Sequence, residues 1–199
     1  MSVPAGNHPI LPVSQSDLND DAFPETLELS GTLLSIVSLG QTVWQSPAGW
    51  NVIQAAISDL DHDGHPEVIL LVWRPFKPWP VDKWLPNGGR ITDFQNSAGQ
   101  SCHMILVHWK QGVYRELWAG SALADPVTSF IAADLDGDNT QELAVLEGRY
   151  ADIKTAPAQI LKVWEWNGFG FTVVSYKEGL FDQMTPVRVS DGRILILVP

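Results

Sequence analysis

The chain has 199 residues, of which 23 are acidic and 12 basic, so its formal net charge is −11. This balance argues against nucleic-acid binding, which needs a basic surface, and against attraction to anionic membranes. No run of about 18 apolar residues occurs, so no transmembrane helix is expected. A hydrophobic fraction of 45% is normal for a globular protein, and the length suffices for one domain with a sizeable core.

Residues 1–28 are rich in Pro, Ser, Asn and Asp. They lack the basic start and the apolar stretch of a signal peptide, so no such signal is expected there. This composition predicts an extended N-terminal arm, followed by a single domain over residues 29–199.

From residue 33 onward the chain alternates between two kinds of strand pair. Hairpins are predicted where two apolar runs flank a Gly turn, as at Gln111-Gly112 and Asn167-Gly168. The other pairs join two apolar runs through a polar loop. The predicted hairpins cover 33–46, 103–119 and 160–175, and the loop pairs cover 52–74, 127–149 and 186–198. The pattern predicts about twelve strands and almost no helix, hence an all-β fold.

Two loop pairs contain the same spacing of acids. Residues 59–68 read DLDHDGHPEV and residues 134–143 read DLDGDNTQEL, with Asp at positions one, three and five and Glu at position nine. Clustered carboxylates repel one another, and an ion that takes six to eight oxygen ligands explains why they are gathered. All-oxygen donors argue against zinc and copper, and magnesium prefers a stricter geometry. We therefore expect about two Ca²⁺ ions, one in each loop.

The expected ligands follow from the spacing. The side chains are those of the Asp and Glu residues, and the residue at position seven offers its backbone carbonyl. In the first loop these are Asp59, Asp61, Asp63, His65 and Glu67; in the second they are Asp134, Asp136, Asp138, Thr140 and Glu142. Position six needs a turn conformation, which Gly64 reaches freely and Asn139 tolerates. An EF-hand would need Glu at position twelve and flanking helices, whereas Leu70 and Val145 stand there.

These loops and their flanking strands resemble the FG-GAP and VCBS-type repeat family, whose blades build the integrin alpha-subunit propeller. The resemblance implies a β-propeller-like array of about three four-stranded blades. The hairpin at 33–46 and the strands at 186–198 would form one blade from both ends of the chain, or oligomerisation would close the array. It also implies an extracellular or cell-surface location. No Phe-Gly…Gly-Ala-Pro element accompanies either loop.

An insertion over 75–102 separates two strands of the first blade. Its start is rich in Trp, Pro and basic residues, so that aromatic faces and cations could bind a sugar, an acidic peptide or an anion. The alternative is that the rings pack on the sheet. The candidate ligand-binding residues here are Trp73, Arg74, Trp79, Trp84 and Arg90.

No nucleophile elbow, phosphate-binding glycine loop or zinc-protease motif is present. The sequence therefore favours a non-catalytic, calcium-stabilised binding or scaffold module that meets a protein or a glycan. Two alternatives stay open. One is a carbohydrate-active enzyme or its accessory domain, and the other is a structural subunit of a homo-oligomer.

Overall fold

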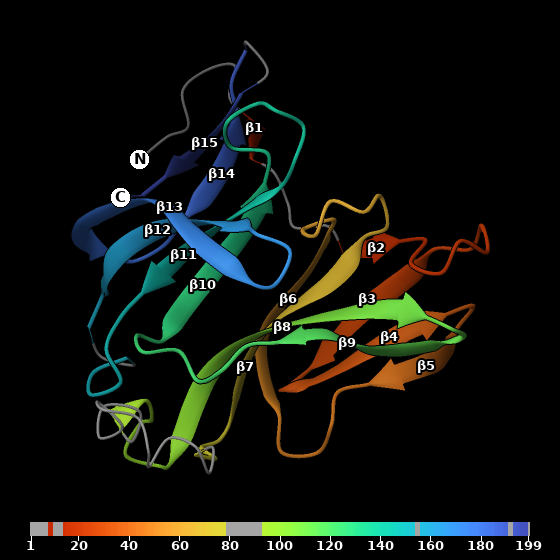
Figure 1. Ribbon diagram of the computed structural model, residues 1–199, viewed down its shortest axis with the longest axis horizontal. Coiled ribbons are helices and arrows are strands. Elements are labelled where there is room, and N and C mark those ends of the chain that lie inside the picture. The colour runs from red at the N-terminus through yellow and green to blue at the C-terminus, as the bar shows by residue number, and fades with distance from the viewer. Residues whose placement is uncertain (1–7, 10–13, 79–92, 154–155, 191–192, 199) are drawn as a thin grey trace.

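The computed structural model describes residues 8–9, 14–78, 93–153, 156–190 and 193–198. Its strands form four antiparallel sheets, which confirms the all-β fold (Figure 1). Three sheets have four strands each, taken in chain order. The β2–β5 sheet contains β2 (Gln15–Ser16), β3 (Glu25–Ser30), β4 (Leu33–Ser38) and β5 (Gln41–Gln45).

The next two sheets have the same order. The β6–β9 sheet contains β6 (Asn51–Ser58), β7 (Glu67–Pro75), β8 (Gln100–Lys110) and β9 (Val113–Ala119). The β10–β13 sheet contains β10 (Val127–Ala133), β11 (Glu142–Glu147), β12 (Ala158–Trp166) and β13 (Phe171–Phe181). The C-terminal sheet contains β14 (Thr185–Arg188) and β15 (Ile194–Leu197), with β1 (His8–Pro9) paired to β14.

Within the sheets, the strand pairs expected from residue 33 onward form as the sequence indicates. The turn at Gln111-Gly112 has φ of 53° and 83°, the left-handed pair of a two-residue hairpin turn. The turn after β12 is longer: the Asn167 N–H donates to the Gly170 carbonyl at 2.9 Å, and Gly168 has a φ of 88°. The insertion expected over 75–102 is shorter at both ends, since β7 extends to Pro75 and β8 begins at Gln100, so the connection between them covers residues 76–99.

The strands that make up the terminal sheets differ from those expected. The hairpin at 33–46 does not join the C-terminal strands; it follows β2 and β3, inside a sheet of its own. Part of the expected arm at 1–28 is therefore folded into strands. The N- and C-terminal segments do meet, but through β1, where His8 lies opposite Arg188. Two polar residues, Gln15 and Ser16, make up β2, which leaves almost no apolar signal for a strand.

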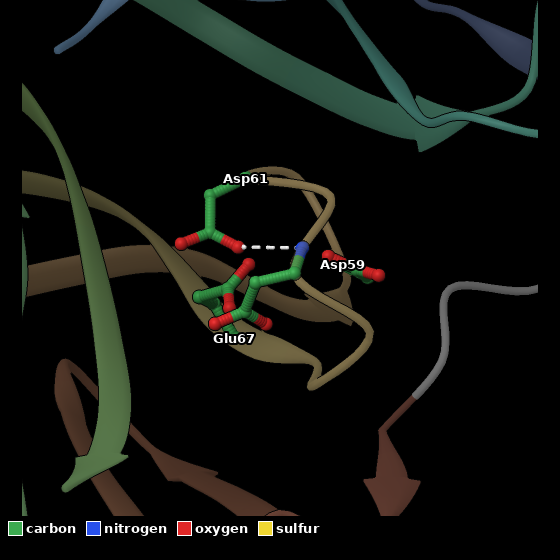
Figure 2. Close-up of side chains that lie close together, drawn as sticks. Asp59, Asp61 and Glu67 are labelled. Carbon is green, nitrogen blue, oxygen red and sulfur yellow. Dashed lines mark hydrogen bonds between the residues drawn. The ribbon is translucent and has the colours of Figure 1, made fainter. Parts of the chain in front are cut away.

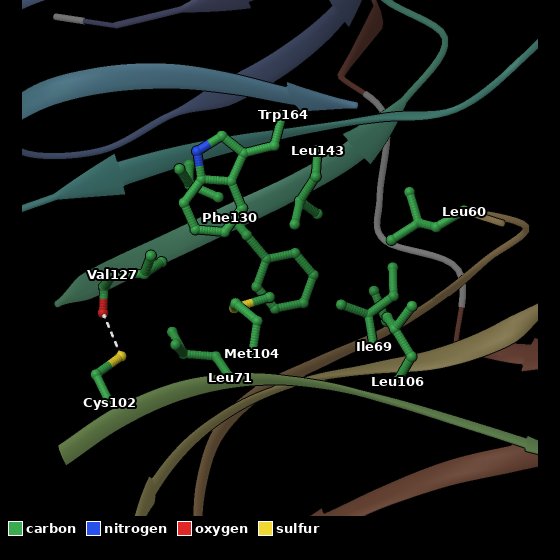
Figure 3. Packing of buried hydrophobic residues seen from close by; sticks show 12 residues of the cluster. Leu60, Ile69, Leu71, Cys102, Met104, Leu106, Val127, Phe130, Leu143 and Trp164 are labelled. Carbon is green, nitrogen blue, oxygen red and sulfur yellow. Dashed lines mark hydrogen bonds between the residues drawn. The ribbon is translucent and has the colours of Figure 1, made fainter. Parts of the chain in front are cut away.

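The sheets pack face to face in chain order. β7 reads EVILLVWRP and contains the continuous apolar run VILLVW rather than an alternating pattern, because both of its faces are buried. Ile69 and Leu71 point to the β10–β13 sheet and meet Phe130, while Leu70 packs on the β2–β5 side. Figure 3 shows the first of these clusters, with Phe130 and Met104 at its centre between the two sheets.

A smaller third cluster forms around Leu146 and Phe181, with Met184 packed against it.

No closed ring of sheets is detected among the described residues. In the same described part of the chain, no helix has the length and apolar character to cross a membrane.

Candidate metal centres

Each acidic loop joins the first two strands of its sheet. Residues 59–66 connect β6 to β7, and residues 134–141 connect β10 to β11. Because neighbouring strands run antiparallel, each loop lies at the same end of its sheet as the turn between the last two strands. We call this end the acidic edge.

The loop backbone is shaped by two left-handed residues. Position four is His62 in the first loop and Gly137 in the second, with φ of 62° and 90°. Position six is Gly64 and Asn139, with φ of 91° and 71°, as the residue types predict. The two bends turn the chain around its own side chains, so that alternate carboxylates converge on one side.

Backbone N–H groups then hold those carboxylates in place, by the same bonds in both loops. The residue at position two donates to the Glu at position nine: Leu60 to Glu67 at 3.0 Å and Leu135 to Glu142 at 2.7 Å. Position six donates to position one, from Gly64 to Asp59 and from Asn139 to Asp134. Positions five and seven donate to the carboxylates two residues before them. Each Asp is thereby oriented before any ion arrives.

The first loop brings four carboxylates together. One oxygen from each of Asp59, Asp61, Asp63 and Glu67 lies within 4.8 Å of the others, a group that could hold a metal ion. Figure 2 shows Asp61 and Glu67 facing one another across the turn, with Asp59 on the adjoining part of the chain. In the second loop, Asp134, Asp136 and Asp138 meet the same condition, and Glu142 is not in the group.

The first loop is electrostatically unsatisfied. Glu67 is only 1% exposed, and burial together with the Asp61 and Asp59 carboxylates raises its pKa to about 8. Burial and the neighbouring Asp63 also raise the pKa of Asp61. Asp59 Oδ1 is buried and has no hydrogen-bond partner among the described residues. A divalent cation would supply the missing positive charge and the missing ligand for that oxygen.

The second loop is more exposed. Burial raises the pKa of Glu142, and hydrogen bonds from Thr140 lower the pKa of Asp138. The Thr140 hydroxyl and N–H both donate to Asp138, at 2.5 and 2.7 Å. At the matching position in the first loop, the His65 N–H donates to Asp63 at 2.9 Å. The carbonyl-ligand roles of His65 and Thr140 stay predictions.

A third loop of this shape lies in the segment expected to be an arm. Residues 17–25 read DLNDDAFPE and join β2 to β3. Leu18 donates to Glu25 at 2.8 Å, and Ala22 donates to Asp17 at 2.9 Å, as their counterparts do in the other loops. Left-handed φ values again occur at positions four and six, 60° at Asp20 and 69° at Ala22. The spacing of Asp17, Asp21 and Glu25 is a signal that could have identified this loop from sequence.

The third loop differs at position three, where Asn19 replaces Asp. Its amide nitrogen donates to Asp21 at 3.1 Å and to Glu25 at 2.9 Å. Two N–H donors therefore lie between the carboxylates, in the place that an ion would occupy in the other loops. Glu25 is fully buried, yet both of its oxygens accept hydrogen bonds. This loop satisfies its acids without a cation.

The three loops touch one another along the acidic edge. His65 of the first loop lies 3.0 Å from the Asp20 carboxylate of the third loop, so these two loops are in contact. His62 Nε2 of the first loop lies 3.3 Å from the Gln141 carbonyl of the second loop, so these two loops are also in contact. The edge is thus one continuous surface built from three sheets.

The five candidate ligand-binding residues in β7 and the insertion fall into two groups. Trp73 packs edge-on against Tyr150, with ring centroids 5.7 Å apart, and the Arg74 guanidinium lies 5.7 Å from the Trp50 ring centroid. Both contacts are with the body of the domain. Trp79, Trp84 and Arg90 lie outside the described residues.

A serine–histidine contact lies near the insertion. The Ser101 hydroxyl is 2.8 Å from His103 Nε2, and His103 Nδ1 is 2.9 Å from the Gly120 carbonyl. His103 Nδ1 also lies 3.2 Å from Arg74 Nη2, so both ring nitrogens are in contact with neighbouring polar groups. Burial lowers the pKa of His103 to about 4, and Ser101 is fully buried. Such a weak base and an inaccessible hydroxyl suit packing better than acyl transfer.

Comparisons with protein-family models, with curated proteins and with solved structures gave no match.

Proposed function

We propose that this protein is a non-catalytic, calcium-stabilised binding or scaffold module. The observation that carries the proposal is the group of four carboxylates from Asp59, Asp61, Asp63 and Glu67, whose oxygens lie within 4.8 Å of one another. Every donor is a hard oxygen, which suits Ca²⁺ better than transition metals. The three-Asp group of the second loop would hold a second ion, completed by Glu142, carbonyls or water.

The sheets would act as the blades of a propeller-like array. Three observations support this: the repeated four-stranded order, the face-to-face packing of successive sheets, and the acidic loop at the same place in three of them. The likeness of the two Asp-rich loops to FG-GAP and VCBS-type repeats points the same way. Because that likeness implies an extracellular or cell-surface location, such a location is part of the proposal.

The metal would act on binding through the shape of the acidic edge. A cavity of about 900 Å³ opens between β6, β10 and β14, and residues of the second acidic loop form part of its wall, including Asp134, Asn139 and Gln141. Its size is that of a small-molecule or peptide site. An ion that fixes the loop would therefore also fix this wall. A protein segment or a glycan is the proposed occupant.

Calcium titration by calorimetry on chelator-stripped protein tests the proposal. We expect two binding events, both lost in an Asp61→Ala, Asp136→Ala double variant. An Asp182→Ala, Glu165→Ala variant, which removes two acids outside the loops, should keep them. Calcium should also raise the melting temperature, because an ion that binds only the folded chain stabilises it. No binding heat together with unchanged melting would show that the loops are ordinary acidic turns.

Self-association is a second candidate, favoured by β13. This strand of 11 residues is the last of its sheet, and all residues from 172 to 180 are exposed. Tyr176 and Leu180 are 67% and 71% exposed, an unusual apolar content for a free strand edge. Light scattering should give twice the mass of the 21.9 kDa chain, and Val174→Lys should return the monomer. A monomeric wild type at high concentration would remove this candidate.

A further inference from the structure

The free edge of β10 borders the cavity of about 900 Å³. All residues of this strand from 129 to 133 line the cavity. β10 is the first strand of its sheet, and β11 is its only hydrogen-bonded neighbour strand in the described part of the chain. Every second residue of an edge strand turns its N–H and carbonyl away from the sheet. This edge therefore offers backbone donors and acceptors to the cavity.

One step of this edge is already paired, by a side chain rather than by a strand. The Gln54 amide of β6 donates to the Phe130 carbonyl at 2.7 Å and accepts from the Phe130 N–H at 3.1 Å. These are the two bonds that one residue of an added strand would make. The Phe130 ring points into the main core (Figure 3), while its N–H and carbonyl point away from β11. Those of Ala132, two residues further along the strand, point the same way.

The next step of the edge is open. No hydrogen bond to the Ala132 backbone on the cavity side is found among the described residues. An unpaired N–H and carbonyl in the wall of a cavity form a template for an extended chain. Alternate residues of a strand repeat at about 6.8 Å, and a second polypeptide backbone matches this repeat. The edge therefore favours a peptide over a glycan as the occupant.

The charges that line the cavity favour an acidic ligand. Arg188 and Arg193 belong to its wall, and Asp134 is the one acid among its described lining residues. The two oxygens of Asp134 already accept N–H groups, from Gly137 at 2.6 Å and from Asn139 at 3.1 Å. Two cations beside one acid are an unusual balance in a chain of net charge −11. A guanidinium has five N–H donors, so each Arg can bind a carboxylate alongside its other contacts.

We propose that the cavity binds an extended peptide segment of a partner protein that carries an acidic side chain. The segment would add to the free edge of β10 and exchange hydrogen bonds with the N–H and carbonyl of Ala132. Its carboxylate would meet Arg188 and Arg193, and an apolar side chain would pack on Met184, which also lines the cavity. This inference rests on the proposed function, because it names the occupant of the cavity whose wall the second acidic loop completes.

Titration of the peptide acetyl-Thr-Val-Glu-Val-Thr-amide into ¹⁵N-labelled protein, in excess calcium, tests the proposal. We expect a shift of the Ala132 amide signal and slower hydrogen exchange at this amide, because its N–H gains a partner. The matched peptide with Gln in place of Glu should bind roughly tenfold more weakly, since it loses hydrogen bonds between charged groups.

Methylation of single peptide N–H groups tests the pairing with β10 and leaves the protein unchanged. Alternate N–H groups of an added strand face its neighbour, and those between them face away. Methylating every second N–H should therefore weaken binding roughly tenfold or more, and methylating the N–H groups between them should leave the affinity nearly unchanged.

Matched variants locate the carboxylate. An Arg188→Gln, Arg193→Gln variant should bind the Glu peptide as weakly as the Gln peptide, so that the difference between the two peptides disappears. Both arginines are exposed, so we expect this variant to fold. An Arg115→Gln, Arg149→Gln variant, which changes two exposed arginines outside the cavity, should distinguish the two peptides as the wild type does.

Three results would overturn the proposal. The first is an unshifted Ala132 signal at millimolar peptide, and the second is an effect of methylation that does not alternate along the peptide. The third is tighter binding of tetragalacturonate, which carries carboxylates without a peptide backbone and would assign the cavity to an acidic glycan. Calcium titration of the same samples separates the two proposals. Calcium binding without peptide binding would leave the calcium-stabilised module standing with another occupant, and peptide binding without calcium binding would refute only the role of the metal.

Discussion

Glu67 makes the folding stability of the metal-free protein depend on pH between 4.5 and about 8. Its pKa is raised from the ordinary value of 4.5 to about 8 in the folded chain. Below pH 4.5 it is protonated in both the folded and the unfolded chain. Between 4.5 and 8 only the folded chain holds that proton, so raising the pH through 8 removes stability.

The size of the effect can be worked out above pH 6.5. One pH unit corresponds to about 1.36 kcal/mol for a group that keeps its proton only when folded. From pH 6.5 to a pKa of about 8 the loss is therefore about 2 kcal/mol. His103, whose pKa is lowered to about 4, contributes the opposite trend, but only below its ordinary value of 6.5. The window from pH 6.5 to 9 is thus governed mainly by Glu67.

Urea denaturation of chelator-stripped protein at pH 6.5 and pH 9 measures this loss. Glu67→Gln keeps the shape and is neutral at every pH, so the difference between the two pH values should shrink by about 2 kcal/mol in the variant. Saturating calcium should have the same effect in the wild type, because metal-bound Glu67 is already ionised. If Glu67→Gln declines between these pH values as much as the wild type does, the reasoning about the buried carboxyl is wrong.

Two further predictions follow from the loops and the core. On chelation, hydrogen–deuterium exchange at the amides of Leu60 and Leu135 should speed up. The Leu18 amide should keep its protection, because Asn19 replaces the cation in its loop. Equal acceleration at all three amides would contradict this role of Asn19. Phe130, which is 1% exposed in the main core cluster, should cost roughly 3–5 kcal/mol when changed to Ala. Phe169→Ala is its control, since Phe169 is 88% exposed and should cost less than about 0.5 kcal/mol by urea denaturation; similar losses in both variants would mean that the cluster is not the core.

The sequence predicted those parts of the fold that depend on local patterns. The apolar run of β7 and the Gly turn after β8 are contained within a few residues, and both appear where expected. The same is true of the two Asp-rich loops, whose left-handed position six was predicted from Gly64 and Asn139. In each case a short stretch carries both the strand signal and the turn chemistry.

Other parts had no local signal. The pairing of β1 with β14 joins the two ends of the chain, and two residues of β1 take part in it. The third acidic loop has a weaker sequence signal, because Asn19 stands where the others have Asp and because β2 is short and polar. The Tyr114 hydroxyl is buried beside Glu25 of another sheet, a contact that no spacing of residues along the chain reveals.

Strand order within each sheet, together with contacts between the loops, places all three loops on one edge. In every four-stranded sheet the first connection and the third lie at the same end, since antiparallel neighbours reverse direction at each step. Each loop holds four acids, so 12 of the 23 acidic residues gather there. The core clusters are built mainly from the strands between the two ends; from the acidic loops they include Leu60 and Leu18 but none of the acids. Removing calcium should therefore loosen one edge of the molecule while the packed strands persist, and the metal would control the surface offered to a partner more than the fold itself.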